Sequence, residues 1–158
     1  MDSINNPTAS NYESPSTDEL ILDGTKMAWY LDRLEAWERG ERIAPITVDI
    51  AITRSCNYGC HFCYAMTQEN DRNVIKQEHI FNFLEDCKEI GVKGISYVSD
   101  GESTLSPSFI SSVKHGSELG LSMACATNGF LLTRPKLEEV LPHLTYLRVN
   151  ISAGEPKR

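Results

Sequence analysis

The chain has 158 residues, of which 41% are hydrophobic, and this suits one globular domain with a buried core. Its 22 acidic residues outnumber its 15 basic ones, giving a formal net charge of −7. Nucleic-acid surfaces depend on Lys and Arg, so a nucleic-acid partner is disfavoured. No apolar stretch reaches the ~20 residues of a membrane span, and residues 1–20 lack the basic and apolar regions of a secretory signal.

The first 45 residues predict a tail followed by a helix. Residues 1–24 are rich in Asn, Ser, Thr and Pro and predict a disordered or loosely attached tail. Residues 25–45 are predicted to form an amphipathic helix, with its stop at Gly40, and a linker. We expect this helix to pack beside the first strand, with Trp29 and Trp37 in that packing.

Beyond Pro45, stretches with the pattern of strands alternate with stretches that have the pattern of helices. The predicted strands are Ile46–Thr53, Gly94–Val98, Leu121–Ala126 and Tyr146–Ser152. The predicted helices are Lys76–Ile90, closing at Gly91, Pro107–Leu119, closing at Gly120, and Arg134–Leu141. This alternation predicts an α/β fold with a parallel sheet and right-handed crossovers.

Three cysteines lie within one short loop after the first strand: Cys56, Cys60 and Cys63. Soft thiolates select iron–sulfur clusters, zinc or copper. In a cluster of four irons, three cysteines leave one iron open to a small molecule, as in a catalytic site. A zinc site or a redox thiol cluster is the alternative, but structural zinc usually takes four protein ligands, and His61 is expected to point away. Gly59 is expected to bend this loop with a positive φ.

The other two cysteines, Cys87 and Cys125, lie in a predicted helix and a predicted strand. Free cysteine is among the most buried residue types, so we expect both to be small core residues. An odd total of 5, with three in one loop, does not suit a disulfide framework.

The cysteine spacing, with the aromatic Phe62 before the third cysteine, resembles the radical S-adenosylmethionine (SAM) family. Three later strand ends are similar to further elements of that family. They are Ser99-Asp100-Gly101-Glu102, which is similar to its Gly-Gly-Glu element, Thr127-Asn128-Gly129, and Val149-Asn150-Ile151-Ser152. Two positions depart from the pattern: Asp100 replaces a glycine and adds a carboxylate, and Gly154 replaces an aspartate. The closest subgroup by appearance contains molybdenum-cofactor cyclases and peptide-maturing enzymes.

The resemblance implies the N-terminal part of a partial (β/α)6 barrel, with a parallel sheet and helices outside. Residues 46–158 would hold about three and a half βα units of ~30 residues or more, where six would need roughly 200 residues. Active sites of such barrels lie at the C-terminal ends of the strands. The implied ligands of a [4Fe–4S] cluster are Cys56, Cys60 and Cys63. The implied SAM contacts are Phe62 near the adenine, Gly101, Glu102 at the amino group, Thr127, Asn128, and Ser152 at the ribose.

Two of these assignments have structural alternatives that the sequence leaves open. The run Asp-Gly-Glu-Ser-Thr from Asp100 is also typical of a turn before a helix cap, and Ser106 could supply that cap without Glu102. Asn128-Gly129 is itself a turn signal.

The implied function is reductive cleavage of SAM to a 5′-deoxyadenosyl radical, which abstracts hydrogen from an unknown substrate. The expected partner is a one-electron donor such as a flavodoxin or ferredoxin. The expected setting is a reducing cytoplasm, because such clusters are oxygen-sensitive. The resemblance names no further catalytic residue. The alternative is a non-enzymatic module that binds a metal or an iron–sulfur cluster.

Overall fold

The computed structural model describes residues 29–67, 72–98 and 100–152. The chain divides into two units, residues 1–43 and residues 44–158. The predicted tail, Ser99 and Gly154 lie outside the described residues.

The first unit contains one described α-helix, α1 (Leu31–Glu38). Gly40 follows it with a φ of +78°, a conformation that favours glycine, so the predicted stop is confirmed. Helix α1 has no buried residue, and Trp37 is 64% exposed. The packing of α1 beside the first strand stays a prediction.

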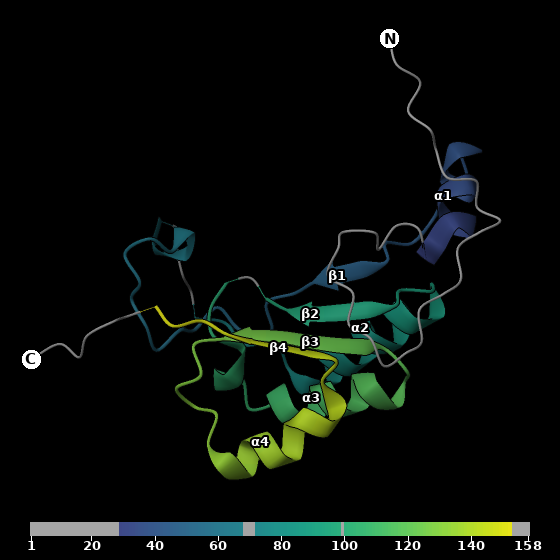
Figure 1. Ribbon diagram of the computed structural model, residues 1–158. Helices are drawn as coiled ribbons and strands as arrows, with labels where there is room; N and C mark the ends of the chain where they lie inside the picture. Colours follow the sequence, from purple (N-terminus) through teal and green to yellow (C-terminus); the bar gives the residue numbers. More distant parts are fainter. Residues whose placement is uncertain (1–28, 68–71, 99, 153–158) are drawn as a thin grey trace, which may run out of the picture. The chain divides into compact units, whose positions relative to one another are not determined.

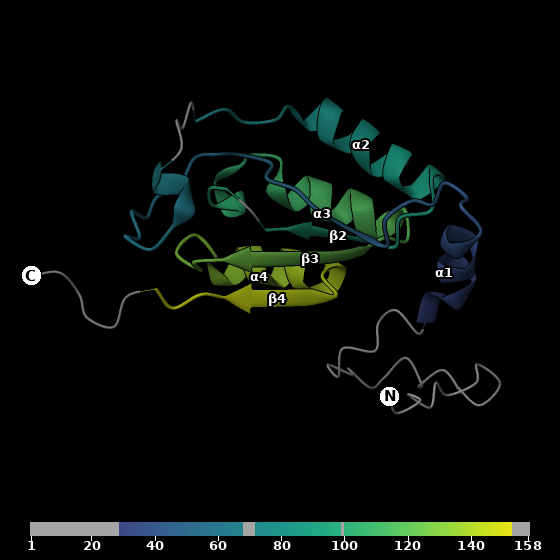
Figure 2. The same ribbon diagram turned by 90° about the horizontal axis from the view of Figure 1, so that it is seen from above.

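The second unit is built on a parallel sheet of four strands in the order β1-β2-β3-β4 (Figure 1). The strands are β1 (Thr47–Asp49), β2 (Gly94–Tyr97), β3 (Ser122–Thr127) and β4 (Tyr146–Val149). The connections carry α2 (Gln77–Glu89), α3 (Phe109–Glu118) and α4 (Arg134–Val140). Short helical turns are η3 (Tyr64–Thr67), η4 (Ser103–Leu105) and η5 (Leu141–His143). The helices lie on one side of the sheet (Figures 1 and 2), so the predicted α/β fold is confirmed.

The core lies between this side of the sheet and the helices. Because side chains alternate along a strand, every second residue of the central strands faces the helices. These buried strand residues are Ile95, Tyr97, Met123 and Cys125, and Ile80, Leu84, Cys87, Phe109 and Val113 of the helices join them. Gly116 of α3 lies where a Cβ would overlap the Met123 sulfur, so glycine permits the close approach of α3 to β3.

The other side of the sheet carries mostly small and polar side chains, with Tyr146 of β4 paired with Ala124. Asp49, Ser96 and Ala124 are aligned across β1, β2 and β3, and Ala126 is aligned with Arg148 of β4. The alternation that buries Met123 and Cys125 directs Ala124 and Ala126 to this side. The sheet therefore has an apolar face under the helices and a small-residue, polar face opposite.

Two predicted strands are longer than the observed ones. The ladder of β1 ends after Asp49, although the Ile50 N–H still donates to the Ser96 carbonyl oxygen at 2.9 Å. Beyond it, Thr53 pairs with Val74 in an antiparallel bridge, which leads the chain away from β2. The predicted strand to Thr53 was therefore wrong, because the last residues found a different partner. Strand β4 was predicted to end at Ser152, but it ends at Val149.

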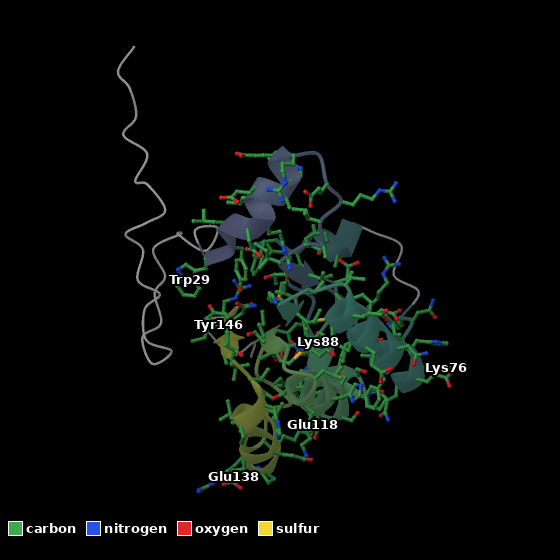
Figure 3. All side chains as sticks on the ribbon, turned by 90° about the vertical axis from the view of Figure 1, so that its right-hand side faces the viewer. Trp29, Lys76, Lys88, Glu118, Glu138 and Tyr146 are labelled. Atoms are coloured by element: carbon green, nitrogen blue, oxygen red, sulfur yellow. The ribbon has the colours of Figure 1, made fainter. Side chains whose placement is uncertain are left out.

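The ends of the helices agree with the sequence. Gly91 and Gly120 follow α2 and α3 with φ values of +91° and +77°, as expected of helix stops. Figure 3 looks onto this end of the sheet, where Lys88 and Glu118 lie in the last turns of α2 and α3 and Tyr146 begins β4. No helix in the described ranges is long and apolar enough to cross a membrane.

Candidate functional site

The three clustered cysteines lie in the loop beyond the C-terminal end of β1, toward which the strand arrows in Figure 1 point. Cys56 is exposed, and Cys60 and Cys63 are half-buried. The Cys63 N–H donates to the Cys60 carbonyl oxygen at 2.9 Å, which closes a tight turn between these two residues. All three cysteines line one cavity of about 490 Å³, together with Arg72 and Gly101.

The arrangement of these thiols fits a cluster better than a single ion. Among the described residues, no group of three or more His, Cys, Asp or Glu side chains is close enough to hold one metal ion. In a cubane each thiolate binds a different iron, so the thiolates stand farther apart than around a zinc ion. His61 places its ring against Phe62, with centroids 5.3 Å apart. Three soft donors around one cavity therefore suit a [4Fe–4S] cluster.

The cysteine loop contacts the loop that follows β3 through two neighbouring residues. The Asn128 side-chain amide donates to the Asn57 side-chain oxygen at 2.8 Å. Next to them, the rings of Tyr58 and Phe130 meet edge to face, with centroids 6.2 Å apart. The expected positive φ at Gly59 was wrong, since a Cβ there would meet nothing within 4 Å and Gly59 is not among the positive-φ glycines. Contacts between two loops, and not a left-handed glycine, hold this segment.

Gly101 occupies a position that only glycine fits without strain. Its φ is +74°, and a Cβ would overlap the carbonyl oxygen of Thr53 and lie 2.7 Å from that of Ser55. The adjacent Glu102 N–H donates to the Ser55 oxygen at 2.8 Å. This contact joins the turn after β2 to the start of the cysteine loop. Asp100 lies 3.6 Å from the Arg54 guanidinium, so the carboxylate that departs from the family pattern has a cationic partner.

The Glu102 carboxylate is the centre of a hydrogen-bond network at the ends of β2 and β3. Oε1 accepts from the Thr104 and Thr127 hydroxyls, each at 2.6 Å, and from the Thr104 N–H at 3.2 Å. Oε2 accepts from the Asn128 N–H at 2.7 Å. The Thr127 hydroxyl in turn accepts from the Gly129 N–H at 3.0 Å. Glu102 is also the N-cap residue of η4, through the Thr104 N–H. The cap by Ser106 that the sequence left open was wrong, since Ser108 is the N-cap residue of α3.

This carboxylate is buried and has no cationic partner within the described part of the chain. Glu102 is 3% exposed, and the ion pairs between described residues do not include it. Burying a carboxylate is unfavourable unless hydrogen bonds and an opposite charge offset its lost hydration. Glu102 has hydrogen bonds, whereas no cationic side chain of the described residues forms an ion pair with it. A positively charged ligand at Oε2 would complete the site electrostatically.

A second cavity, of about 460 Å³, extends from the cysteine loop across the polar face of the sheet. It brings together every residue for which the sequence predicted a role: Cys56, Cys60, Phe62, Cys63, Gly101, Glu102, Thr127, Asn128 and Ser152. Their individual roles stay predictions. The sequence reasoning missed Asp49, Arg148 and Asn150, which also line this cavity, and Thr104, which holds Glu102. Alternation along the predicted strand Tyr146–Ser152 could have identified Arg148 and Asn150, since both are spaced from Ser152 by an even number of residues.

Comparison with known proteins gives a family for this arrangement. Residues 50–157 match the sequence profile of the Radical SAM superfamily. An S-adenosylmethionine-dependent nucleotide dehydratase of Selenomonas ruminantium is 28% identical over 113 residues, which cover 70% of this chain and 40% of that protein. A GTP 3′,8-cyclase of Campylobacter fetus is 30% identical over 109 residues, covering 65% of this chain and 33% of the relative. The chain therefore spans less than half the length of these curated relatives.

Solved structures show the same fold. BtrN in complex with AdoMet and 2-DOIA superposes with a TM-score of 0.63 at 17% identity, over 74% of this chain and 50% of BtrN. SuiB of Streptococcus suis bound to S-adenosylmethionine superposes with a TM-score of 0.59 at 20% identity, over 82% of this chain and 30% of SuiB. The four-stranded sheet and its helices thus match part of the partial barrel of radical SAM enzymes.

Proposed function

This chain belongs to the Radical SAM superfamily, and we propose that its second unit holds a [4Fe–4S] cluster and SAM and cleaves SAM reductively. The buried Glu102 carboxylate, which has hydrogen bonds but no cation among the described residues, carries this proposal. SAM offers an ammonium group that would supply the missing charge. Cys56, Cys60 and Cys63 would hold the cluster, leaving one of its irons without a protein ligand.

When bound, the cluster supplies the electron that converts SAM to methionine and a 5′-deoxyadenosyl radical, which abstracts hydrogen from the substrate. The protein positions and shields these groups. Among the described residues, Oε2 of Glu102 accepts one hydrogen bond, from the Asn128 N–H, and so keeps acceptor capacity for the SAM ammonium. Gly101 keeps the turn beside Glu102 free of a side chain. Phe62 lines the cavity near the cysteines, where its ring would cover the adenine, and Ser152 would bind a ribose hydroxyl.

We further propose a nucleotide as the substrate class to test first. The Selenomonas relative is described as a nucleotide dehydratase and the Campylobacter relative as a GTP cyclase. The proposed electron donor is a flavodoxin or a ferredoxin, since each delivers single electrons at low potential.

The decisive experiment is SAM cleavage by the anaerobically reconstituted protein. We expect 5′-deoxyadenosine, measured by mass spectrometry, when dithionite or reduced flavodoxin is added to the iron-loaded protein with SAM. A protein with its cluster intact that binds SAM and forms no 5′-deoxyadenosine would support the alternative, a non-enzymatic iron–sulfur module. Loss of SAM binding altogether would contradict the proposed role of Glu102.

A further inference from the structure

Of the described residues that line the 460 Å³ cavity, Arg148 is the one with a basic side chain. Within the described part of the chain its guanidinium has no hydrogen bond and no ion pair. By contrast, Arg54 pairs with Asp100, and Arg134 pairs with Glu138 on the surface. Arg148 therefore faces a ligand-sized space with all its donors available.

Two polar residues that follow Arg148 in the chain, Asn150 and Ser152, line the same cavity. Successive residues of an extended strand point to opposite faces, so Arg148, Asn150 and Ser152 share the cavity side, where all three lie. Ile151, between the last two, is 90% exposed. The Asn150 N–H donates to the Thr127 carbonyl oxygen at 2.8 Å, which keeps this segment beside β3. A guanidinium, an amide and a hydroxyl thus form a row of donors, which we call the β4 donor row.

The position of Arg148 separates it from the expected place of SAM. Arg148 precedes Ser152 by four residues, which allows a separation of up to about 13 Å along the chain. Glu102 follows β2, two strand spacings or about 10 Å from β4. The carboxylate and the amino group of SAM are attached to one carbon, so a SAM amino group at Glu102 keeps that carboxylate beside Glu102 as well. Arg148 is therefore available to bind the substrate.

The floor of the cavity beside Arg148 leaves room for that reactant. Ala126, which lines the cavity, is the β3 neighbour of Arg148, while Ala124 outside the cavity is paired with Tyr146. Asp49, the carboxylate nearest the far edge of the sheet, is about three strand spacings or ~14 Å away from β4. A substrate can therefore lie across the small side chains without displacing an existing ion pair of Arg148.

We propose that Arg148 binds an acidic group of the substrate, a phosphate of the proposed nucleotide, and that Asn150 contacts the adjacent sugar. The planar guanidinium presents two parallel N–H donors, which match the geometry of phosphate and carboxylate oxygens. This inference rests on the proposed function, since it assumes that Glu102 and Ser152 hold SAM. It adds a specificity residue, exposed and four positions before Ser152 in the chain, to the SAM contacts.

The test compares ligands that differ only in phosphate content. GTP, guanosine and tripolyphosphate are titrated by calorimetry into the reconstituted, SAM-loaded chain and into Arg148→Gln, Arg148→Lys and Arg134→Gln. We expect Arg148→Gln to weaken GTP and tripolyphosphate binding by roughly tenfold to a hundredfold, as for a lost charged hydrogen bond. Arg148→Lys keeps the charge without the planar fork and should fall between. Guanosine should not distinguish the variants, and Arg134→Gln, which removes the same charge from α4, should behave as wild type.

Several outcomes would overturn the inference. They are the absence of GTP and tripolyphosphate binding to the wild-type chain, an equal loss of GTP and guanosine affinity in Arg148→Gln, and a larger loss for SAM than for GTP. The last result would mean that Arg148 holds the SAM carboxylate. Cleavage of SAM by the wild-type chain, measured separately, tests the proposed function itself. If the wild type cleaves SAM but does not bind phosphate through Arg148, the present inference fails while the proposed function stands.

Discussion

The Thr127 hydroxyl donates to Oε1 of Glu102 at 2.6 Å and so ties the end of β3 to the turn after β2. With two donors from Thr104, this bond fills the acceptor capacity of Oε1. Among the described residues, Oε2 accepts only from the Asn128 N–H. The carboxylate is therefore held at one oxygen and available to a ligand at the other.

Replacing the three loop cysteines together by Ala should abolish iron binding. The reconstituted wild type should carry about four irons per chain, since the three thiols line one cavity and suit a cubane. Iron content and the brown visible absorbance are the measurements. Cys87→Ala is the matched control, because Cys87 is buried in α2 and should leave the iron content unchanged. A full iron complement in the triple variant would rule out the assignment.

Glu102→Gln should weaken SAM binding and leave the iron in place. Loss of one charged hydrogen bond costs ~1.5–3 kcal/mol, or roughly ten- to a hundredfold in dissociation constant. Calorimetry with the iron-loaded variant measures this, and Glu138→Gln on the exposed side of α4 is the control. A SAM affinity equal to that of the wild type would show that Glu102 has only its capping role.

Gly101→Ala should destabilise the second unit, whereas Gly59→Ala should not. An alanine at Gly101 must adopt a φ of +74° and would lie 2.7 Å from the Ser55 carbonyl oxygen. We expect a loss of at least ~2 kcal/mol in the free energy of unfolding. At Gly59 a Cβ meets nothing within 4 Å, and a change within ~0.5 kcal/mol is expected. Urea unfolding of the two variants makes the comparison, and equal midpoints would contradict it.

The free energy of unfolding should fall at alkaline pH because the buried Cys125 thiol resists ionisation in the folded state. Burial, with a further contribution from the negative charge of Glu102, raises the pKa of the Cys125 thiol to about 12. The unfolded thiol ionises near pH 8.5, so above that pH the folded state keeps a proton that the unfolded state releases. Stability from this group is complete below about pH 8.5 and is lost as the pH rises toward 12, by up to ~1.4 kcal/mol per pH unit.

The measurement is the free energy of unfolding of the metal-free protein between pH 8 and pH 10. Burial also raises the pKa of Tyr97 to about 12, which acts in the same direction above about pH 10, so the comparison is made below that pH. Cys125→Ala should show a flatter pH dependence than the wild type. Identical slopes in the two proteins would mean that Cys125 ionises alike in the folded and unfolded states.

The sequence predicted the elements well where the signal is local. Gly91 and Gly120 predicted the ends of α2 and α3, because glycine commonly follows the last turn of a helix. The alternation of strand-like and helix-like stretches located the central strands. The predicted end of β1 was wrong because Thr53 pairs with Val74 and not with β2. Val74 lies 21 positions away, and no local sequence pattern indicates this pairing.

The candidate site shows the same division. The cysteine spacing and the Glu102 turn are local patterns, and all their residues line one cavity. Thr104 and Arg148 were missed for different reasons. Thr104 lies in a run that reads equally well as an ordinary cap, and its contact with Oε1 depends on the depth at which Glu102 is buried. Arg148 could be recognised as a candidate only from the structure, which shows that it lines the cavity and that its β3 neighbour is the small Ala126.

The hydrogen bond between Asn57 and Asn128 has a thermodynamic consequence for the whole site. Asn57 lies between two proposed iron ligands, while the backbone of Asn128 binds Glu102, so one contact belongs to both binding events. Coupling between two ligands is reciprocal: if assembly of the cluster orders this contact and tightens SAM binding by some factor, SAM tightens iron retention by the same factor. Oxidative loss of iron should therefore also release the cosubstrate, and saturating SAM should protect the bound iron from chelators.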